Sequence, residues 1–207
     1  MDEESRSGRK RRAIMEAATT LFLRNGYQGT SMDEVAALAA VSKQTVYKQF
    51  ADKEQLFGEI ILGIADRAEE FAPVVAATLA GAEDLERDLG ALARRYVAFV
   101  MQPSVLQLRR LIIGEAGRFP ELARAYYRRA PERTVATLAA SLRQLADRGL
   151  LRLDDPVLAA NHFAFLVLSV PLDRAMFCGD EQPVDAADLD RFADAGVRVF
   201  LAAYGPR

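Results

Sequence analysis

The sequence predicts an all-α protein, with an N-terminal helix-turn-helix domain of three helices and a C-terminal helical bundle, about nine helices in total. Two observations predict this class. Apolar residues recur three and four positions apart, and no segment shows the sustained alternation of a half-buried strand. Glycine and proline fall mostly at intervals that separate such segments. With 207 residues, 51% of them apolar, the chain can bury one or two cores.

The composition excludes several classes of protein. No run reaches the roughly 18 uninterrupted apolar residues of a membrane helix. The N-terminus is acidic and then basic and lacks the apolar core of a secretory signal. Cys178 is the single cysteine, which excludes an internal disulfide and a cysteine-based zinc site. We therefore expect a cytoplasmic protein with no membrane partner.

Catalysis finds little support in the sequence. There is no nucleophile elbow, phosphate-binding loop or cluster of His, Cys and acidic residues at metal-ligand spacing. We expect no enzyme activity, no catalytic residue, no metal and no cofactor.

The charge distribution favours a nucleic-acid partner. Residues 5–50 carry eight Lys or Arg against three Asp or Glu, although the net charge of the whole chain is -2. A basic module on an acidic body is the layout expected of a nucleic-acid-binding protein whose second domain has another task.

The first predicted helix ends near Asn25, and Gly26 follows it as a stop signal. A basic cluster, Arg9–Arg12, stands just ahead of this helix. It could be an arm that reaches phosphates or a minor groove, or a solubilising tail. The apolar face of the helix consists of Ile14, Ala17, Ala18, Leu21 and Phe22.

The stretch Thr30–Leu56 predicts two short helices joined by a tight turn, and then the start of a third. Ser31 and Glu34 have the spacing of a capping box, and Ser42 and Asp52 are the next two N-cap candidates. The second of these helices, KQTVYKQ, has a mostly polar face. Such a face suits a DNA groove or a solvated surface, and its basic setting favours the groove.

The rest of the chain predicts helices throughout. A long helix from Lys53 to about residue 80 should kink at Pro73, because proline removes a backbone donor. Further helices are expected at 82–101, from Ser104 to Gly117, from Pro120 to Gly149, from Asp155 onward, and from Asp185 to Tyr204.

Sixteen residues in the N-terminal region form a recognisable pattern. They are Gly26, Tyr27, Thr30, Ser31, Val35, Ala36, Val41, Ser42, Thr45, Val46, Tyr47, Phe50, Lys53, Glu54, Gln55 and Leu56. Through this pattern residues 10–57 resemble, without a gap, the DNA-binding domain of the tetracycline-repressor (TetR) family. One departure is Ala40, because family members usually carry glycine in the turn before Val-Ser. The segment Arg110–Leu151 resembles the body of the AefR-like or AcrR-like subgroup.

The resemblance implies a DNA-binding domain at 1–57 and a ligand-binding and dimerisation domain at 58–207. It also implies a transcriptional regulator, most simply a homodimeric repressor that a hydrophobic small-molecule effector releases from a palindromic operator. Two rivals remain open. One is a carrier or lipid sensor whose N-terminal module does not bind DNA, which Ala40 favours, and the other is a ligand-independent DNA-binding protein.

The same resemblance implies which residues contact DNA. Thr30 and Ser31 fall where a helix N-terminus would face a phosphate, and Tyr47 and Lys53 look like contacts to the DNA backbone. The full set is Thr30, Ser31, Ser42, Lys43, Gln44, Thr45, Tyr47, Lys48 and Lys53, of which Gln44 and Lys48 are the strongest candidates for base readout.

Two further sets of residues follow from the helices that form the pocket and the dimer seam in this family. For each residue, ordinary core packing is the competing interpretation. The expected pocket residues are Tyr96, Phe99, Ile113, Phe119, Tyr127, His162, Phe163 and Met176. The expected seam residues are Phe165, Leu168, Leu172, Phe192, Val199 and Phe200.

Overall fold

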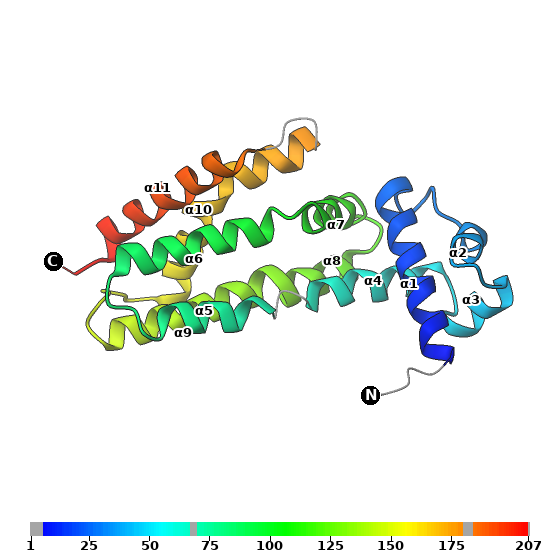
Figure 1. The fold of residues 1–207 in the computed structure, drawn as a ribbon, viewed down its shortest axis with the longest axis horizontal. Helices are drawn as coiled ribbons and strands as arrows, with labels where there is room; N and C mark the ends of the chain where they lie inside the picture. Colours follow the sequence, from blue (N-terminus) through cyan, green and yellow to red (C-terminus); the bar gives the residue numbers. More distant parts are fainter. Residues whose placement is uncertain (1–5, 67–69, 180–183, 207) are drawn as a thin grey trace. The chain divides into compact units, whose positions relative to one another are not determined.

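The structure is a computed structural model that describes residues 6–66, 70–179 and 184–206 (Figure 1). Every regular element within these ranges is a helix, so the predicted all-α class is confirmed. The described chain contains more separate helices than the nine expected, because two segments expected to be single helices are interrupted.

Contacts divide the chain into two compact units. The first is Met1–Ala65 with Gln107–Tyr126, and the second is Asp66–Leu106 with Tyr127–Arg207. The sequence predicts a domain boundary near residue 57, at the end of the helix-turn-helix motif. The division by contacts differs, because it groups residues 107–126 with the N-terminal helices. The first unit contains α1 (Arg6–Asn25), α2 (Met32–Leu38), α3 (Lys43–Gln49), α4 (Lys53–Ala65), most of α7 (Pro103–Gly114) and nearly all of α8 (Pro120–Tyr127).

The second unit is a helical bundle around one apolar core. In this core α10 packs against α9 and α11, α11 packs against α6, and α5 packs against both α6 and α9. By length and composition alone α10 could cross a membrane, and 39% of its apolar window is buried. The elements are α5 (Phe71–Leu79), α6 (Leu85–Val100), the π-helix η2 (Arg128–Glu132), α9 (Arg133–Asp147), α10 (Pro156–Cys178) and α11 (Ala186–Tyr204).

Two expected helices differ from the prediction at prolines. The helix expected to run through Pro73 is instead two helices, because α4 ends at Ala65 and α5 begins at Phe71. Pro73 therefore lies in a first turn, where its missing N–H has no helical acceptor to lose. Further on, the helix opened by Pro120 widens into η2 around Pro131. A wide turn accommodates a proline that would otherwise clash with the preceding turn.

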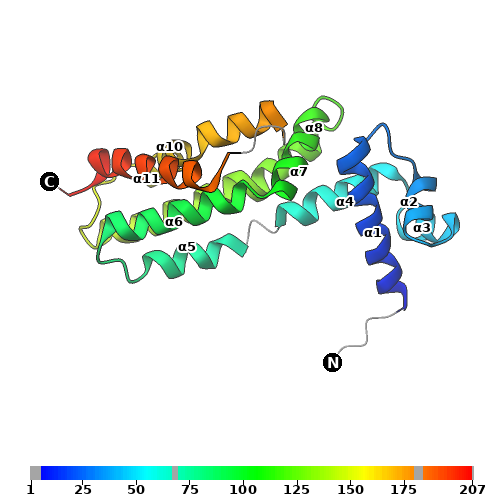
Figure 2. The same cartoon turned by 45° about the horizontal axis from the view of Figure 1, so that its top comes forward.

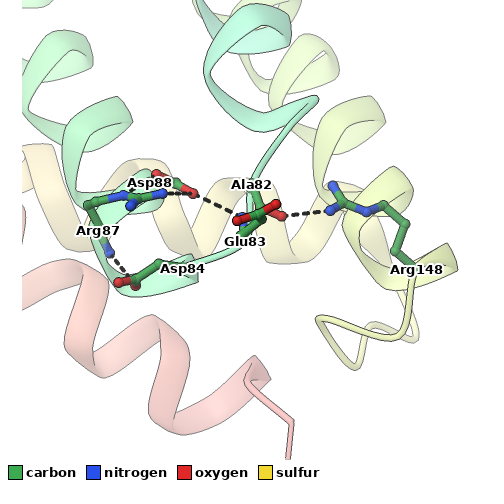
Figure 3. Close-up of polar contacts among 6 residues, drawn as sticks. All are labelled: Ala82, Glu83, Asp84, Arg87, Asp88 and Arg148. Atoms are coloured by element: carbon green, nitrogen blue, oxygen red, sulfur yellow. Dashed lines mark hydrogen bonds and ion pairs between the residues drawn. The ribbon is translucent and has the colours of Figure 1, made fainter.

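The loop between α5 and α6 is fixed from both sides (Figure 3). The guanidinium of Arg148, just beyond α9, donates to the Ala82 carbonyl at 2.6 Å. On the other side, Asp84 caps α6 by accepting from the Arg87 amide at 3.0 Å, and the Asp88 carboxylate accepts from the Glu83 amide at 3.2 Å. The start of α6 is therefore held in place.

The caps predicted in the first unit are confirmed. Ser31 and Glu34 form the reciprocal capping box of α2. Ser42 caps α3 by accepting from its third amide, and Asp52 accepts from the Gln55 amide at 2.7 Å at the start of α4. These side chains satisfy amides that would otherwise lack partners at helix ends.

The basic cluster Arg9–Arg12 lies within α1, which begins at Arg6 rather than after the cluster. The expectation of an arm ahead of the first helix was therefore wrong for these four residues. Arginine and lysine are good helix formers, so the helix extends into the cluster although no apolar residue marks its start.

The turn between α2 and α3 is left-handed at Ala40, whose φ is 52°. The Val41 amide donates to the Ala36 carbonyl at 3.1 Å, and the Ala40 amide donates to the Ala37 carbonyl at 3.2 Å. These two bonds define a Schellman motif, which usually has glycine at the left-handed position. Alanine adopts this backbone at a cost of about 1 kcal/mol, so the turn is formed under strain.

Ala40→Gly is expected to raise the free energy of unfolding by about 1 kcal/mol, because glycine relieves this strain. The matched control is Ala39→Gly, because Ala39 has an ordinary φ of -76°. Glycine there only adds freedom to the unfolded chain and should lower stability by about 0.5–1 kcal/mol. Urea denaturation followed by circular dichroism measures both changes, and an Ala40→Gly variant no more stable than the wild type would contradict the strain.

Candidate DNA-binding surface

Helix α3 turns a polar face outward. Gln44, Tyr47 and Lys48 are exposed, whereas Val46 is the one buried residue of this helix. The exposed side chains supply an amide, a phenol and an ammonium group. Amides can pair with base edges, and ammonium and phenol groups can bind phosphate oxygens. The structure thus places five of the predicted DNA-binding residues on α3, and all of them except Thr45 are exposed.

The N-terminal end of α3 is tied to its surroundings by polar contacts. The hydroxyls of Ser42 and Thr45 are hydrogen bonded at 2.8 Å. Lys43 Nζ lies 2.7 Å from the carboxylate of Asp33 in α2, and the hydrogen bond to Asp33 raises the pKa of Lys43. Both partners are exposed, so the pair contributes little stability. Its effect is to hold the Lys43 ammonium beside α2, where Asp33 competes with phosphate for it.

The two residues before α2 are bonded within the protein. Thr30 is only 2% exposed, and its hydroxyl donates to the Gly26 carbonyl at 2.9 Å. The Thr30 hydroxyl therefore has a structural role, whereas the phosphate contact at the N-terminus of α2 stays a prediction. Ser31 remains exposed, but its amide and hydroxyl both donate to Glu34 at 2.8 Å. These hydrogen bonds lower the pKa of Glu34.

Lys53 stabilises the turn between α1 and α2. Its Nζ donates to the carbonyls of Tyr27 and Thr30, both at 2.8 Å, and lies 4.3 Å from the centroid of the Tyr27 ring. Burial lowers the pKa of Lys53, and the nearby Arg118 guanidinium lowers it further. Two of the three ammonium hydrogens are thus used within the protein, which leaves one for the phosphate contact expected of this residue.

A cluster of four aromatic rings lies beneath this turn. Tyr27 packs against Phe57 at 5.0 Å between centroids and against Phe119 at 4.7 Å, and Phe22 contacts both Tyr27 and Phe57. Phe119 was expected in a ligand pocket, but the structure places its ring in this cluster. No pattern in the sequence indicates the contact between Tyr27 and Phe119, because α2 to α7 separate the two residues along the chain.

The other predicted pocket residues differ in their exposure and in the unit to which they belong. Ile113 lies in the first unit and is exposed, and Tyr127 and His162 are exposed in the second unit. The rest of the set packs within the second unit: Tyr96 and Phe163 are buried in its core, Phe99 packs against that core, and Met176 is half-buried on α10. The apolar pattern correctly indicated helix faces, but it does not distinguish a cavity wall from a packed core.

Helices α10 and α11 lie side by side (Figure 2). Both helices carry exposed apolar residues. Phe165 on α10 is 69% exposed, and Val199 on α11 is 54% exposed. Both line an open hollow of about 570 Å³, which we call the seam hollow. His162 and Tyr204, whose side chains are hydrogen bonded at 2.6 Å, also line it.

Two of the predicted seam residues are buried. Leu168 and Phe200 are 6% and 0% exposed and belong to the core of the second unit, and Phe200 also lines the seam hollow. Phe200 packs against Phe163 with the ring centroids 5.4 Å apart. Leu172 and Phe192 are half-buried. Helical spacing placed these residues on apolar faces, but the crossing of α10 and α11 covers part of each face.

A capped polar helix that follows a second short helix across a tight turn defines a helix-turn-helix protein. Comparison with protein families agrees with this class. Residues 14–60 match the family described as bacterial regulatory proteins of the tetR family, and residues 87–206 match the C-terminal domain of AefR-like transcriptional repressors. The chain belongs to the TetR family of transcriptional regulators.

Two solved structures resemble nearly the whole chain. One, from Mesorhizobium loti MAFF303099, is assigned to the TetR family of transcriptional regulators. It is 46% identical, with a TM-score of 0.89, over 98% of this chain and 100% of that one. The other is the flavonoid-responsive regulator FrrA, which is 35% identical, with a TM-score of 0.76, over 97% of this chain and 99% of that one.

Several curated relatives match only part of this chain. The HTH-type transcriptional regulator YhgD of Bacillus subtilis is 51% identical over 51 residues, which are 25% of this chain and 27% of that protein. RutR of Escherichia coli strain K12 is 35% identical over 75 residues, which cover 32% of this chain and 35% of RutR. These matches therefore span only about a quarter to a third of each relative's length.

Proposed function

We propose that the chain binds a specific palindromic DNA operator through α3 as a homodimer, and that a hydrophobic small-molecule effector releases it. The observation that carries the proposal is the exposed polar face of α3, which is capped at Ser42 and anchored by Val46. DNA binding is assigned to 1–57, and effector binding and dimerisation are assigned to 58–207.

The dimer is proposed to form through the seam hollow and the apolar surface around it. Phe165 and Val199 project from two adjacent helices of the same unit. Two copies facing one another would cover both helices and form a four-helix interface with two-fold symmetry. Two α3 helices related by this symmetry would read two half-sites, which is why a palindrome is expected.

The effector is proposed to be apolar and aromatic. FrrA, which resembles this chain over nearly its full length, is described as flavonoid-responsive. In the second unit Phe71 lies 5.4 Å from Tyr96 and 5.5 Å from Phe99, measured between ring centroids. Because these rings are packed in the core, a planar aromatic molecule would stack on them only after they move apart. It would weaken DNA binding only through a difference in its affinity for the free and DNA-bound conformations.

Selection of bound sequences from a random DNA pool should enrich one short palindrome. Gln44→Ala should then relax the base preference at a defined position of each half-site, a loss of about 1–3 kcal/mol of discrimination, because the amide would no longer pair with a base edge. Parallel selection with the wild type measures this change. A chain that enriches no sequence would refute the proposed function, and an unchanged preference in Gln44→Ala would refute only its role in readout.

Phe165→Lys is expected to convert the dimer to a monomer, because two lysines would meet near the symmetry axis of an apolar interface. Sedimentation velocity distinguishes the monomer from the dimer by mass. Ile113→Lys is the matched control, because Ile113 is 60% exposed but lies in the first unit. A dimer that survives Phe165→Lys, or that Ile113→Lys disrupts equally, would contradict this interface.

Effector release is tested on the selected operator with a panel of flavonoids and aliphatic fatty acids. The proposal predicts that at least one planar aromatic compound weakens operator binding about fivefold or more, the usual range of such coupling. Fluorescence anisotropy of labelled operator measures the change. Operator binding that no compound on the panel alters would count against an aromatic effector while leaving the DNA-binding proposal standing.

A further inference from the structure

Arg11 joins three elements of the first unit. It lies on α1, and its Nη2 forms an ion pair with the carboxylate of Glu59 on α4. Its guanidinium carbon lies 4.5 Å from the centroid of the Phe50 ring, and its Nη1 donates to the Gln49 carbonyl at 3.5 Å. The side chain thus contacts the end of α3 and the middle of α4 together.

These contacts fall at the C-terminal end of α3. Gln49 is the last residue of α3, and Phe50 is its fully buried C-cap. A cation at this position interacts favourably with the unpaired carbonyls of the last turn. The Gln49 side chain adds a second link to α1, because its Nε2 donates to the Ser7 hydroxyl at 3.0 Å.

The two ends of α3 are therefore fixed by different neighbours. Lys43 and Asp33 join its N-terminal end to α2, whereas Arg11 and Ser7 join its C-terminal end to α1. Since α3 is only seven residues long, these end contacts define its direction. Small changes in that direction would displace the exposed side chains from their base partners.

We propose that Arg11 is a positioning residue, which sets the direction of α3 through Gln49 and Phe50, and that Glu59 holds Arg11 in place. The inference rests on the proposed DNA binding by α3. It differs from the simpler interpretation of the basic cluster in α1, in which Arg11 neutralises a phosphate. The stacking on Phe50 and the pairing with Glu59 hold its guanidinium against the protein, although 41% of the side chain stays exposed.

The two interpretations predict opposite effects of Glu59→Gln. If Arg11 contacts phosphate, Glu59 competes with DNA for its charge, and removing the carboxylate should strengthen binding. If Arg11 positions α3, removing the carboxylate loosens Arg11 and should weaken binding. Glutamine nearly matches the shape of glutamate and keeps an oxygen that can accept the Gln55 amide, now 3.2 Å from Glu59.

The experiment measures operator affinity at several salt concentrations for full-length Arg11→Gln, Arg11→Lys, Glu59→Gln and the Arg11→Gln/Glu59→Gln pair. Positioning predicts binding about threefold to tenfold weaker for Arg11→Gln and Glu59→Gln, in line with partly exposed charged contacts. The double variant should be no weaker than Arg11→Gln alone, because both changes break one linkage. The slope of log affinity against log salt concentration should be the same as in the wild type, because no phosphate contact is lost.

Arg11→Lys separates charge from geometry. A lysine could still neutralise a phosphate, but it cannot pair with Glu59, bond to Gln49 and stack on Phe50 as the planar guanidinium does. Positioning therefore predicts weakened binding by Arg11→Lys as well. Arg24→Gln removes one positive charge from the last turn of the same helix and controls for net charge.

The measurements distinguish a positioning role of Arg11 from a phosphate contact. The inference would be overturned if Glu59→Gln bound the operator as strongly as the wild type or more strongly. It would also be overturned if the slope of log affinity against log salt concentration became shallower by about 0.9 in Arg11→Gln. Urea denaturation checks that each variant is folded, and the sign of the Glu59→Gln effect decides the matter even if Arg11→Gln unfolds. A wild-type chain that selects no operator would instead show that the proposed function itself is wrong.

Discussion

The recognition helix α3 is too short to be stable by itself, and the rest of the first unit compensates for this. A helix of seven residues is well below the roughly 12 residues at which isolated helices become even marginal in water. Only Val46 of α3 is buried, so its own packing adds little. The conformation and direction of α3 must therefore come from its caps and from the helices around it.

Residues outside the exposed face of α3 therefore determine its position. Lys53 and the aromatic ring of Tyr27 fix the turn that leads into α2, and Phe119 packs against that ring from a segment distant in sequence. The segment 107–126 belongs to the same compact unit as the first four helices. A shift in the position of residues 107–126 would therefore alter the DNA-binding surface through the contacts of the Phe119 ring, with no substitution in the helix-turn-helix motif.

Local features of this fold could be predicted from the sequence, whereas long-range contacts could not. The caps at Ser31 and Ser42 involve partners three residues away, and the helix-turn-helix spacing is equally local. The burial of Thr30 and the pairing of Arg11 with Glu59 depend on distant elements, and no periodicity reveals them. For the same reason an apolar helix face could not be assigned to a pocket, a seam or a core before its neighbours were known.

The central claim is that tertiary contacts hold α3 in place before DNA arrives. Native-state hydrogen exchange in the free protein tests it through the amides of Val46 and Phe50, which donate within α3 to Ser42 and Val46. The account predicts that both amides exchange only when the first unit unfolds, with the same opening free energy as the amides of α1. Rapid exchange of these two amides while α1 remains protected would show that α3 opens independently, and it would contradict the account.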